Sequence, residues 1–242
     1  MNGTLINTNG SVPYTNSATL GTNADGSFNV DTVLNFSDTV FGVGNFPDDV
    51  QFPGLDEALG PYNWFSTEAL LYIDLTNGFH RFGVNSDDGF QFNALPPAGI
   101  PGSPIQLGIF DNGRAASDSL FDFFVQKSGL YCFQLIYFES GGSASCELFS
   151  VDLGTGDKSL VNDAADPKAF RSYRGLKPRL TRIVPSGSNL VIDWAYGTPP
   201  FQVQSATSLT NPIWTDVGPT TQNRTATVPI PSGTTFIRVF GK

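Results

Sequence analysis

Alternating hydrophobic and polar residues predict strands in the middle of this chain. The segments HRFGV (80–84), SLFDFFV (119–125) and YCFQLIYF (131–138) place apolar side chains at every second position or in short runs. Successive side chains of a strand point to opposite faces, so a period of two indicates half-buried strands, whereas a helix repeats every 3.6 residues. No segment sustains the helical period. We therefore predict an antiparallel, all-β fold.

Further segments of the same kind extend the β pattern along the chain. Segment 64–75 allows a short helix or a strand, and its alternating, β-branched end favours a strand. The turn-forming ESGGSAS between 131–138 and 146–151 predicts a hairpin. The other predicted strands are 31–36, 90–92, 105–110 and 146–151, followed later by 189–196, 200–207, 212–217, 224–230 and 234–240.

Changes in composition divide the chain into three parts. Residues 1–30 are rich in Asn, Thr, Ser and Gly and form a polar arm, which buries too little apolar surface to order itself. A basic stretch with Gly and Pro, residues 169–182, predicts a linker between a β domain at 31–175 and a small β-sandwich at 176–242. We expect the arm to act in assembly through its few apolar residues, Ile6, Val12, Leu20 and Phe28.

Charge and length exclude several classes of partner. The 242 residues include 13 Lys and Arg against 22 Asp and Glu, a net charge of −9 at pH 7. This sign repels phosphate, so we expect neither nucleic acid nor an anionic membrane surface as a partner. No apolar run approaches the roughly 18 residues of a membrane span. The start, MNGTLINTNG, is not a signal peptide, so we expect either an absent leader or another export route.

The cysteines and the single histidine offer little catalytic chemistry. Cys132 and Cys146 are either buried thiols or a disulfide that needs a shifted register or contact across a neighbouring strand. His80 shares the inward face with Phe82 and Val84, so we expect a core histidine. A Ser-His-Asp triad would have to use it, and no nucleophile elbow accompanies it. We predict no catalytic residues and no enzyme activity.

Three segments resemble a known family. HRFGVNSDDGFQF, LGIFDNGRAASDSLFDF and GLYCFQLIYFESGGSASCELFSV, in this order, resemble the PA14-type domains of extracellular bacterial and fungal proteins over about residues 30–165. The later SATSLTNPIWTDVG resembles short Ig-like or fibronectin-III-like modules. The resemblance implies a PA14-like β-sandwich or barrel followed by a small Ig-like sandwich, and an extracellular or cell-surface location.

The resemblance also implies a calcium site. Some PA14 lectins hold Ca²⁺ with two adjacent aspartates joined by a cis peptide and an Asn from a second loop, and the ion then takes sugar hydroxyls. Asp87 and Asp88 match the aspartate pair, and Asp111 and Asn112 are the nearest candidates on a second loop. In an alternative, Arg114 pairs with Asp87 or Asp88 in place of a metal. In another, Ser-Asp-Asp-Gly is a plain type I turn.

Two functions therefore remain nearly balanced. The first is an extracellular structural or assembly protein that self-associates or binds a surface partner protein, because an ordered polar arm and exposed strand edges favour pairing with a neighbour. The second is a calcium-dependent carbohydrate-binding module that uses Asp87 and Asp88 to bind glycans. The arm favours assembly slightly, since a free lectin domain has no evident use for it.

Overall fold

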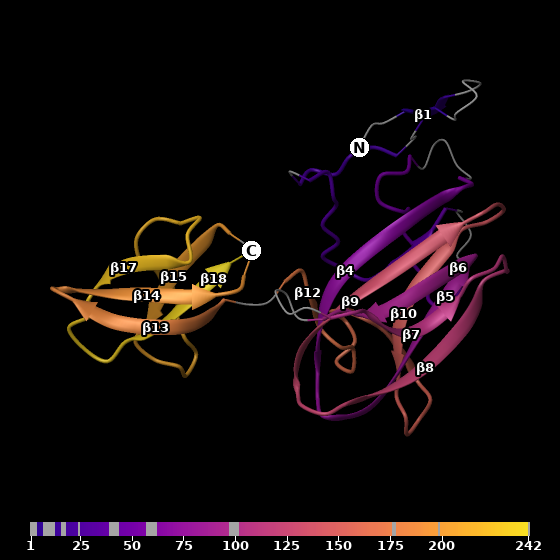
Figure 1. Cartoon of the computed structure of the whole chain (residues 1–242). Coiled ribbons are helices and arrows are strands. Elements are labelled where there is room, and N and C mark those ends of the chain that lie inside the picture. The colour runs from indigo at the N-terminus through magenta and orange to yellow at the C-terminus, as the bar shows by residue number, and fades with distance from the viewer. Residues whose placement is uncertain are drawn as a thin grey trace. The chain divides into compact units, whose positions relative to one another are not determined.

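A computed structural model describes residues 4–6, 13–15, 18–23, 25–38, 44–56, 62–96, 102–175, 178–197 and 199–241. All regular elements in these residues are strands (Figure 1). The predicted all-β class is therefore confirmed. Across the described ranges, no helix is long and apolar enough to cross a membrane. The chain divides into two compact units, residues 1–174 and 175–242.

Two antiparallel five-stranded sheets form most of the first unit. One has the order β11-β10-β5-β8, with β3 and β11 pairing successively along the same edge of β10, and the other has the order β12-β4-β9-β6-β7. The strands are β1 Thr4–Ile6, β2 Pro13–Thr15, β3 Asn35–Ser37, β4 Phe65–Leu75, β5 Gly78–Asp87, β6 Gly89–Ala94, β7 Ile105–Phe110, β8 Ser117–Val125, β9 Gly129–Glu139, β10 Ser145–Val151, β11 Lys158–Leu160 and β12 Ser172–Tyr173.

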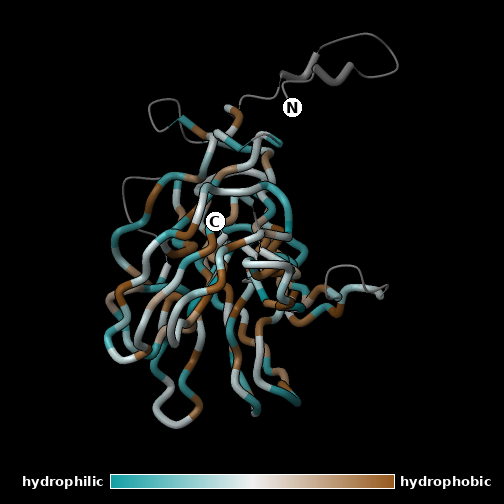
Figure 2. The backbone as a smooth tube through the Cα atoms, turned by 90° about the vertical axis from the view of Figure 1, so that its left-hand side faces the viewer, coloured by the Kyte–Doolittle hydropathy of each residue, from teal (hydrophilic) through white to brown (hydrophobic). Residues whose placement is uncertain are grey.

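Inward-facing side chains of both sheets share one aromatic core. Hydrophobic and hydrophilic residues alternate along the strands (Figure 2), and the hydrophobic set includes the fully buried Phe82 of β5 and Phe92 of β6. The Phe92 ring stacks on that of Phe133 of β9, with 5.2 Å between centroids. Burying one Phe side chain completely stabilises the folded state by about 1.5–3 kcal/mol relative to leaving it exposed. His80 is also buried, as the alternation predicted. Its Nε2 lies 2.8 Å from the Thr76 carbonyl oxygen.

Strand pairing gathers several strand ends at one end of this sandwich. The first residue of β4, Phe65, pairs with the last of β9, Glu139. The last residue of β5, Asp87, pairs with the first of β10, Ser145. We call this region the loop end; its described connections are residues 62–64, 88, 111–116 and 140–144. Because β5 and β6 belong to different sheets, the chain passes from one sheet to the other at Asp88.

The predicted hairpin around ESGGSAS is wrong. β9 pairs with β4 and β6, whereas β10 lies in the other sheet and pairs with β5, β3 and β11. Both strands are occupied on both edges, so the turn between them crosses between sheets. The crossing also separates the cysteines: Cys132 pairs with Tyr72, Cys146 pairs with Ser86, and both thiols are free.

The second unit is a small sandwich of two three-stranded antiparallel sheets, β13-β14-β17 and β16-β15-β18. The predicted linker 169–182 is too long, because β12 and the start of β13 lie within it. Trp194 of β14 is 3% exposed and packs edge-on against Phe201. The Ig-like resemblance stays a prediction. The strands are β13 Arg179–Ser186, β14 Asn189–Ala195, β15 Phe201–Ala206, β16 Thr215–Asp216, β17 Thr225–Pro229 and β18 Phe236–Gly241.

The polar arm is described only in part. β1 and β2 pair with each other in a separate two-stranded ribbon. Leu20 and Phe28, two of the predicted apolar anchors, are 50% and 41% exposed. Val12 and the side chain of Ile6 lie outside the described residues. Thr19 ties this segment to the domain, because its backbone N–H donates to the Gly54 carbonyl oxygen at 2.8 Å.

We predict that Trp194→Ala lowers the stability of the second unit by about 3–5 kcal/mol, because the lost transfer free energy and the cavity add. Urea unfolding of the full chain measures the change. Ile213→Ala is the matched control, since Ile213 is 85% exposed in the same unit and should change stability by less than about 0.5 kcal/mol. A loss below about 1 kcal/mol for Trp194→Ala would contradict the burial of this ring.

Candidate metal centre

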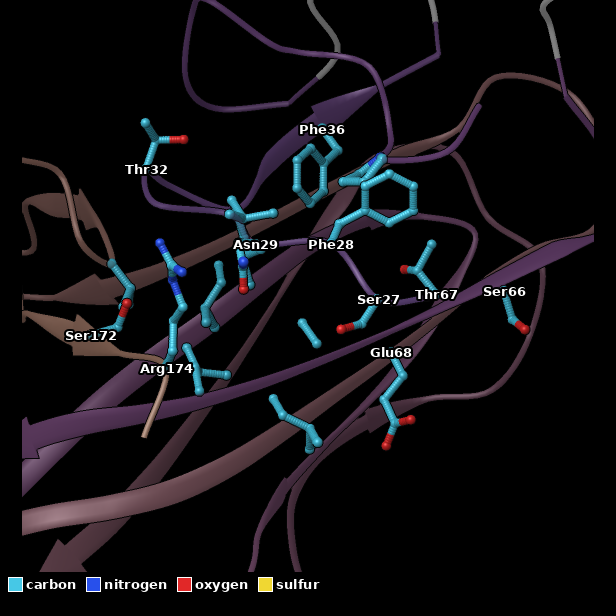
Figure 3. Close-up of a pocket in the computed structure, with 18 of the residues that line it drawn as sticks. Ser27, Phe28, Asn29, Thr32, Phe36, Ser66, Thr67, Glu68, Ser172 and Arg174 are labelled. Carbon is cyan, nitrogen blue, oxygen red and sulfur yellow. The ribbon is translucent and has the colours of Figure 1, made fainter. Parts of the chain in front are cut away.

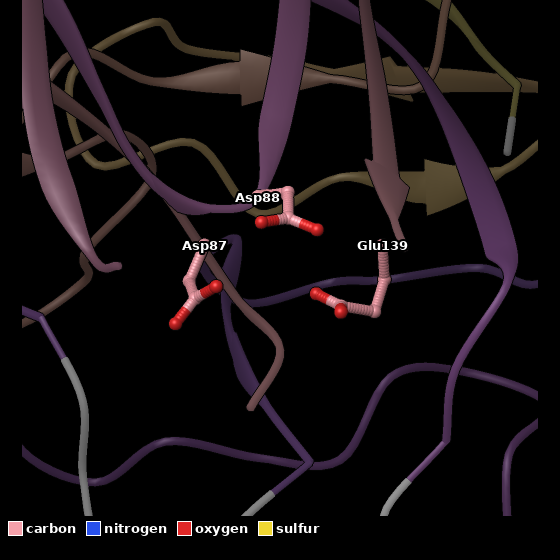
Figure 4. A group of neighbouring side chains, drawn as sticks. All are labelled: Asp87, Asp88 and Glu139. Atoms are coloured by element: carbon pink, nitrogen blue, oxygen red, sulfur yellow. The ribbon is translucent and has the colours of Figure 1, made fainter. Parts of the chain in front are cut away.

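Three carboxylates converge at the loop end. The side chains of Asp87, Asp88 and Glu139 each place an oxygen within 4.8 Å of the other two (Figure 4). Asp88 and Glu139 are buried, at 4% and 2% exposure. The peptide bond between Asp87 and Asp88 is cis, as the resemblance to PA14 lectins implied.

Hydrogen bonds from two loops hold the Asp88 carboxylate. Its Oδ1 accepts the Arg114 backbone N–H at 2.8 Å, and its Oδ2 accepts the Ser140 backbone N–H at 2.9 Å and the Ser140 hydroxyl. Burial alone would raise the pKa of Asp88, but these hydrogen bonds outweigh it and lower the pKa below its usual value. Asp88 is therefore ionised and joins loop 111–116 to loop 140–144.

Tyr137 and Gly141 position the other two carboxyl groups. The buried Tyr137 hydroxyl donates to the Asp87 carbonyl oxygen and lies 3.1 Å from Glu139 Oε2. The Gly141 backbone N–H donates to Glu139 Oε1. The end of β9 thus carries the Glu139 carboxylate, and through the Tyr137 hydroxyl it also holds the backbone of Asp87.

The cluster concentrates negative charge. Burial, and then the charge of Asp88, raise the pKa of Asp87 to about 6. Burial and the neighbouring aspartates raise the pKa of Glu139 to about 7. No ion pair among the described residues includes Asp87, Asp88 or Glu139. Nothing in the described part of the chain thus neutralises the three groups by direct contact.

Arg114 does not clamp the aspartates. Its guanidinium donates to the Ser86 carbonyl oxygen at 3.1 Å, to the Ser86 hydroxyl at 2.8 Å and to the Ser119 hydroxyl at 2.9 Å. The same group lies over the Phe110 ring, 4.1 Å from its centroid. The Arg114 side chain therefore fastens loop 111–116 to β5 and β8, and only its backbone N–H reaches Asp88.

The other residues expected on the second loop belong to the loop that bonds to Asp88, but they lie outside the carboxylate cluster. Asn112 is exposed, and its side-chain oxygen accepts the Gly113 backbone N–H at 2.9 Å within its own loop. Asp111 is exposed as well and is not one of the clustered carboxylates. Glu139 was missed at the sequence level. Glu139 begins the ESGGSAS turn of the third segment that resembles the PA14 family, and the resemblance assigned no ligand there.

The donor set fits a hard cation. Two oxygens bound to one ion at about 2.4 Å lie at most about 4.8 Å apart, so the separations among the three carboxylates meet this requirement for a shared Ca²⁺. Ser145, directly opposite Asp87 on β10, has a fully buried hydroxyl without a hydrogen-bond partner among the described residues. Directly opposed side chains share a face of the sheet, so this hydroxyl is a further oxygen beside Asp87.

Comparisons with known proteins give low similarity. No protein-family model matches the chain, and no curated protein matches it. Among solved structures, the PA14 domain of the MpAFP antifreeze protein is 19% identical, with a TM-score of 0.33, over 44% of this chain and half of that chain. An anti-sigma factor domain-containing protein is 14% identical, with a TM-score of 0.38, over 87% of this chain and 81% of that chain.

We predict that the metal-free protein loses stability as the pH rises from about 4 to about 7. The raised pKa values of Asp87 and Glu139, about 6 and about 7, mean that the folded state binds more protons than the unfolded state in this range. Stability therefore falls as these groups ionise. Melting temperatures in EDTA across this range measure the effect. An Asp87→Asn, Glu139→Gln double variant should flatten the curve, and an equal slope in the variant would contradict the assignment.

Proposed function

We propose that this chain is a non-catalytic, extracellular carbohydrate-binding module that holds a calcium ion with Asp87, Asp88 and Glu139. The observation that carries the proposal is the convergence of three carboxylates within 4.8 Å without an ion-paired basic side chain among the described residues. Like charges at this distance repel, and a divalent cation turns the repulsion into attraction. Because of this cluster we rank carbohydrate binding above assembly, although the sequence slightly favoured assembly.

The donor chemistry supports calcium among the biological cations. The three side chains offer only oxygen, which excludes the thiolate and imidazole sites typical of zinc. Calcium accepts six to eight oxygen ligands in flexible geometry, whereas magnesium demands a near-ideal octahedron. Three carboxyl groups and the Ser145 hydroxyl leave room in such a shell for ligand oxygens.

A carbohydrate suits the remaining positions. The resemblance to PA14-type modules implies that sugar hydroxyls complete the coordination of the ion, and it also implies the extracellular location. Neutral hydroxyls are compatible with the net charge of −9, whereas phosphate groups are not. The proposed partners are therefore neutral glycans on a surface outside the cell.

We predict that calcium raises the melting temperature of the full chain. A ligand that binds only the folded state stabilises it by RT ln(1 + [L]/Kd), about 2.7 kcal/mol at 100 times Kd. Differential scanning calorimetry in calcium and in EDTA measures the shift. Asp88→Asn should abolish it, because that change weakens one of three charged ligands. A shift of the same size in Asp88→Asn would place the ion elsewhere.

Two variants separate this site from its alternatives. Asp111→Asn should leave the calcium shift intact, because Asp111 lies outside the carboxylate cluster. Arg114→Ala should lower the melting temperature equally in calcium and in EDTA, because the guanidinium bonds to Ser86 and Ser119 and stacks on Phe110. A calcium shift lost only in Arg114→Ala would favour a different arrangement of the loop.

Assembly is the second candidate, and an open strand edge favours it. β9 pairs with β4 along its whole length, but on the other edge of β4, β12 pairs only with Tyr72 and Ile73. In the described part of the chain, residues 66–71 have no strand partner on this edge. Such an edge presents backbone N–H and C=O groups that can pair with an added strand.

A cavity of about 590 Å³ borders the open edge. Residues 66–71 form one wall, and residues of segment 25–36 form the other. Figure 3 shows Phe28 and Phe36 on one side of the cavity and Thr67 and Glu68 on the other. An extended segment from a second copy, such as its polar arm, would find both backbone partners and apolar contacts here.

We predict for this candidate that Leu70→Lys dissociates an oligomer at micromolar concentration without changing the unfolding midpoint. Leu70 is 59% exposed on β4, so a lysine there costs the fold little and blocks a close neighbour. Sedimentation velocity measures the mass. Leu209→Lys, 60% exposed in the second unit, is the control and should leave the mass unchanged. A monomeric parent protein at every concentration would reject the assembly candidate.

A further inference from the structure

Trp64 exposes its ring where burial would be expected. Its side chain is 82% exposed, whereas Trp194 is buried in the core of the second unit. A tryptophan is among the largest apolar side chains, and its burial is strongly favourable. The described contacts of the chain give this ring no stacking partner and no cation over its face.

The position of Trp64 is next to the carboxylate cluster. It directly precedes Phe65, which pairs with Glu139 across the start of β4 and the end of β9. Its neighbour Asn63 accepts the Gly142 backbone N–H at 3.0 Å. The segment that bears Trp64 is thus bonded to loop 140–144, the loop that holds Asp88 through Ser140.

A second hydrogen-bonded link fixes the same segment. The Asp38 carboxylate accepts the Tyr62 backbone N–H at 3.1 Å with one oxygen and the Ala144 backbone N–H at 2.8 Å with the other. Residues 62–64 are therefore tied at both ends to the loop beside the cluster. The backbone that bears Trp64 is therefore held beside the loop that contacts Asp88.

The backbone of Trp64 is in a conformation that favours glycine. Its φ angle is +60°, in the left-handed region, where a bulky residue is a genuine outlier. Retaining such a residue costs stability, and strained residues cluster at ligand-binding sites. An exposed ring on a left-handed backbone stabilises the fold little, whereas the same exposure leaves the ring accessible to a ligand.

We infer that Trp64 is a specificity-determining residue that stacks against the carbohydrate bound at Asp87, Asp88 and Glu139. The inference rests on the proposed function. A pyranose has two kinds of surface: hydroxyl groups at its edge and a patch of C–H groups on its face. The cation takes hydroxyls, and the indole ring takes the C–H patch, which removes apolar surface of both from water. The ligand class is a neutral sugar with an unsubstituted C–H face.

The test measures calcium and sugar binding separately. The chain has three tryptophans, so a Trp214→Phe background leaves exposed Trp64 and buried Trp194. Iodide quenching of Trp64 fluorescence is followed with methyl glycosides of galactose, glucose, mannose and fucose, in calcium and in EDTA. We expect at least one glycoside to protect Trp64 from iodide in calcium and none to do so in EDTA.

The decisive variants are Trp64→Gly and Trp64→Phe. Trp64→Gly should raise the melting temperature, because glycine relieves the left-handed backbone, and it should keep the calcium shift but weaken glycoside binding at least tenfold in calorimetry. Trp64→Phe should recover part of the affinity. A purely structural Trp64 would not separate sugar affinity from stability in this way.

Each failure has its own signature. If calcium shifts the melting temperature of the parent protein and of Trp64→Gly alike, but glycoside affinity is unchanged or no glycoside protects Trp64, the role of Trp64 is overturned and the cation site stands. If calcium leaves the parent protein unchanged, the proposed function fails, and the inference about Trp64 fails with it.

Discussion

The structure of the loop end depends on the hydrogen bonds that the Asp88 carboxylate accepts. It accepts backbone N–H groups from Arg114 on one loop and Ser140 on another, so a single buried side chain ties the two loops together. The hydrogen bonds keep Asp88 ionised and lower its pKa. The same negative charge helps to raise the pKa of Asp87 and Glu139. The bonding that joins the two loops and the negative charge concentrated at the cluster therefore both depend on Asp88.

The two sheets of the sandwich determine where the Asp88 carboxylate lies. Asp87 ends a strand in one sheet and Gly89 begins a strand in the other, so the two aspartates lie where the sheets meet. The buried Tyr137 connects the core to the site, because its ring stacks on Phe52 and its hydroxyl reaches Asp87 and Glu139. Packing of the aromatic core thus fixes the positions of the carboxylates, and charge fixes what they can bind.

Local patterns predicted much of this fold. The sequence pattern predicted the strand at 105–110 with the bounds that the structure has, and alternation predicted that His80 is buried. The aspartate pair followed from a short motif. Glu139 did not, because its approach to Asp88 depends on the pairing of β9 with β4 and β6, which no local pattern encodes. For the same reason the hairpin predicted at ESGGSAS was wrong: periodicity shows which face is buried but not which sheet a strand joins.

The central claim is that one calcium ion bridges Asp87, Asp88 and Glu139, and crystals grown in calcium test it most directly. Anomalous diffraction locates calcium independently of the surrounding atoms. The account predicts one strong anomalous peak at the loop end, about 2.3–2.6 Å from an oxygen of each of the three side chains. A fully ordered loop end with no peak there, or with a peak that contacts none of the three carboxylates, would contradict it.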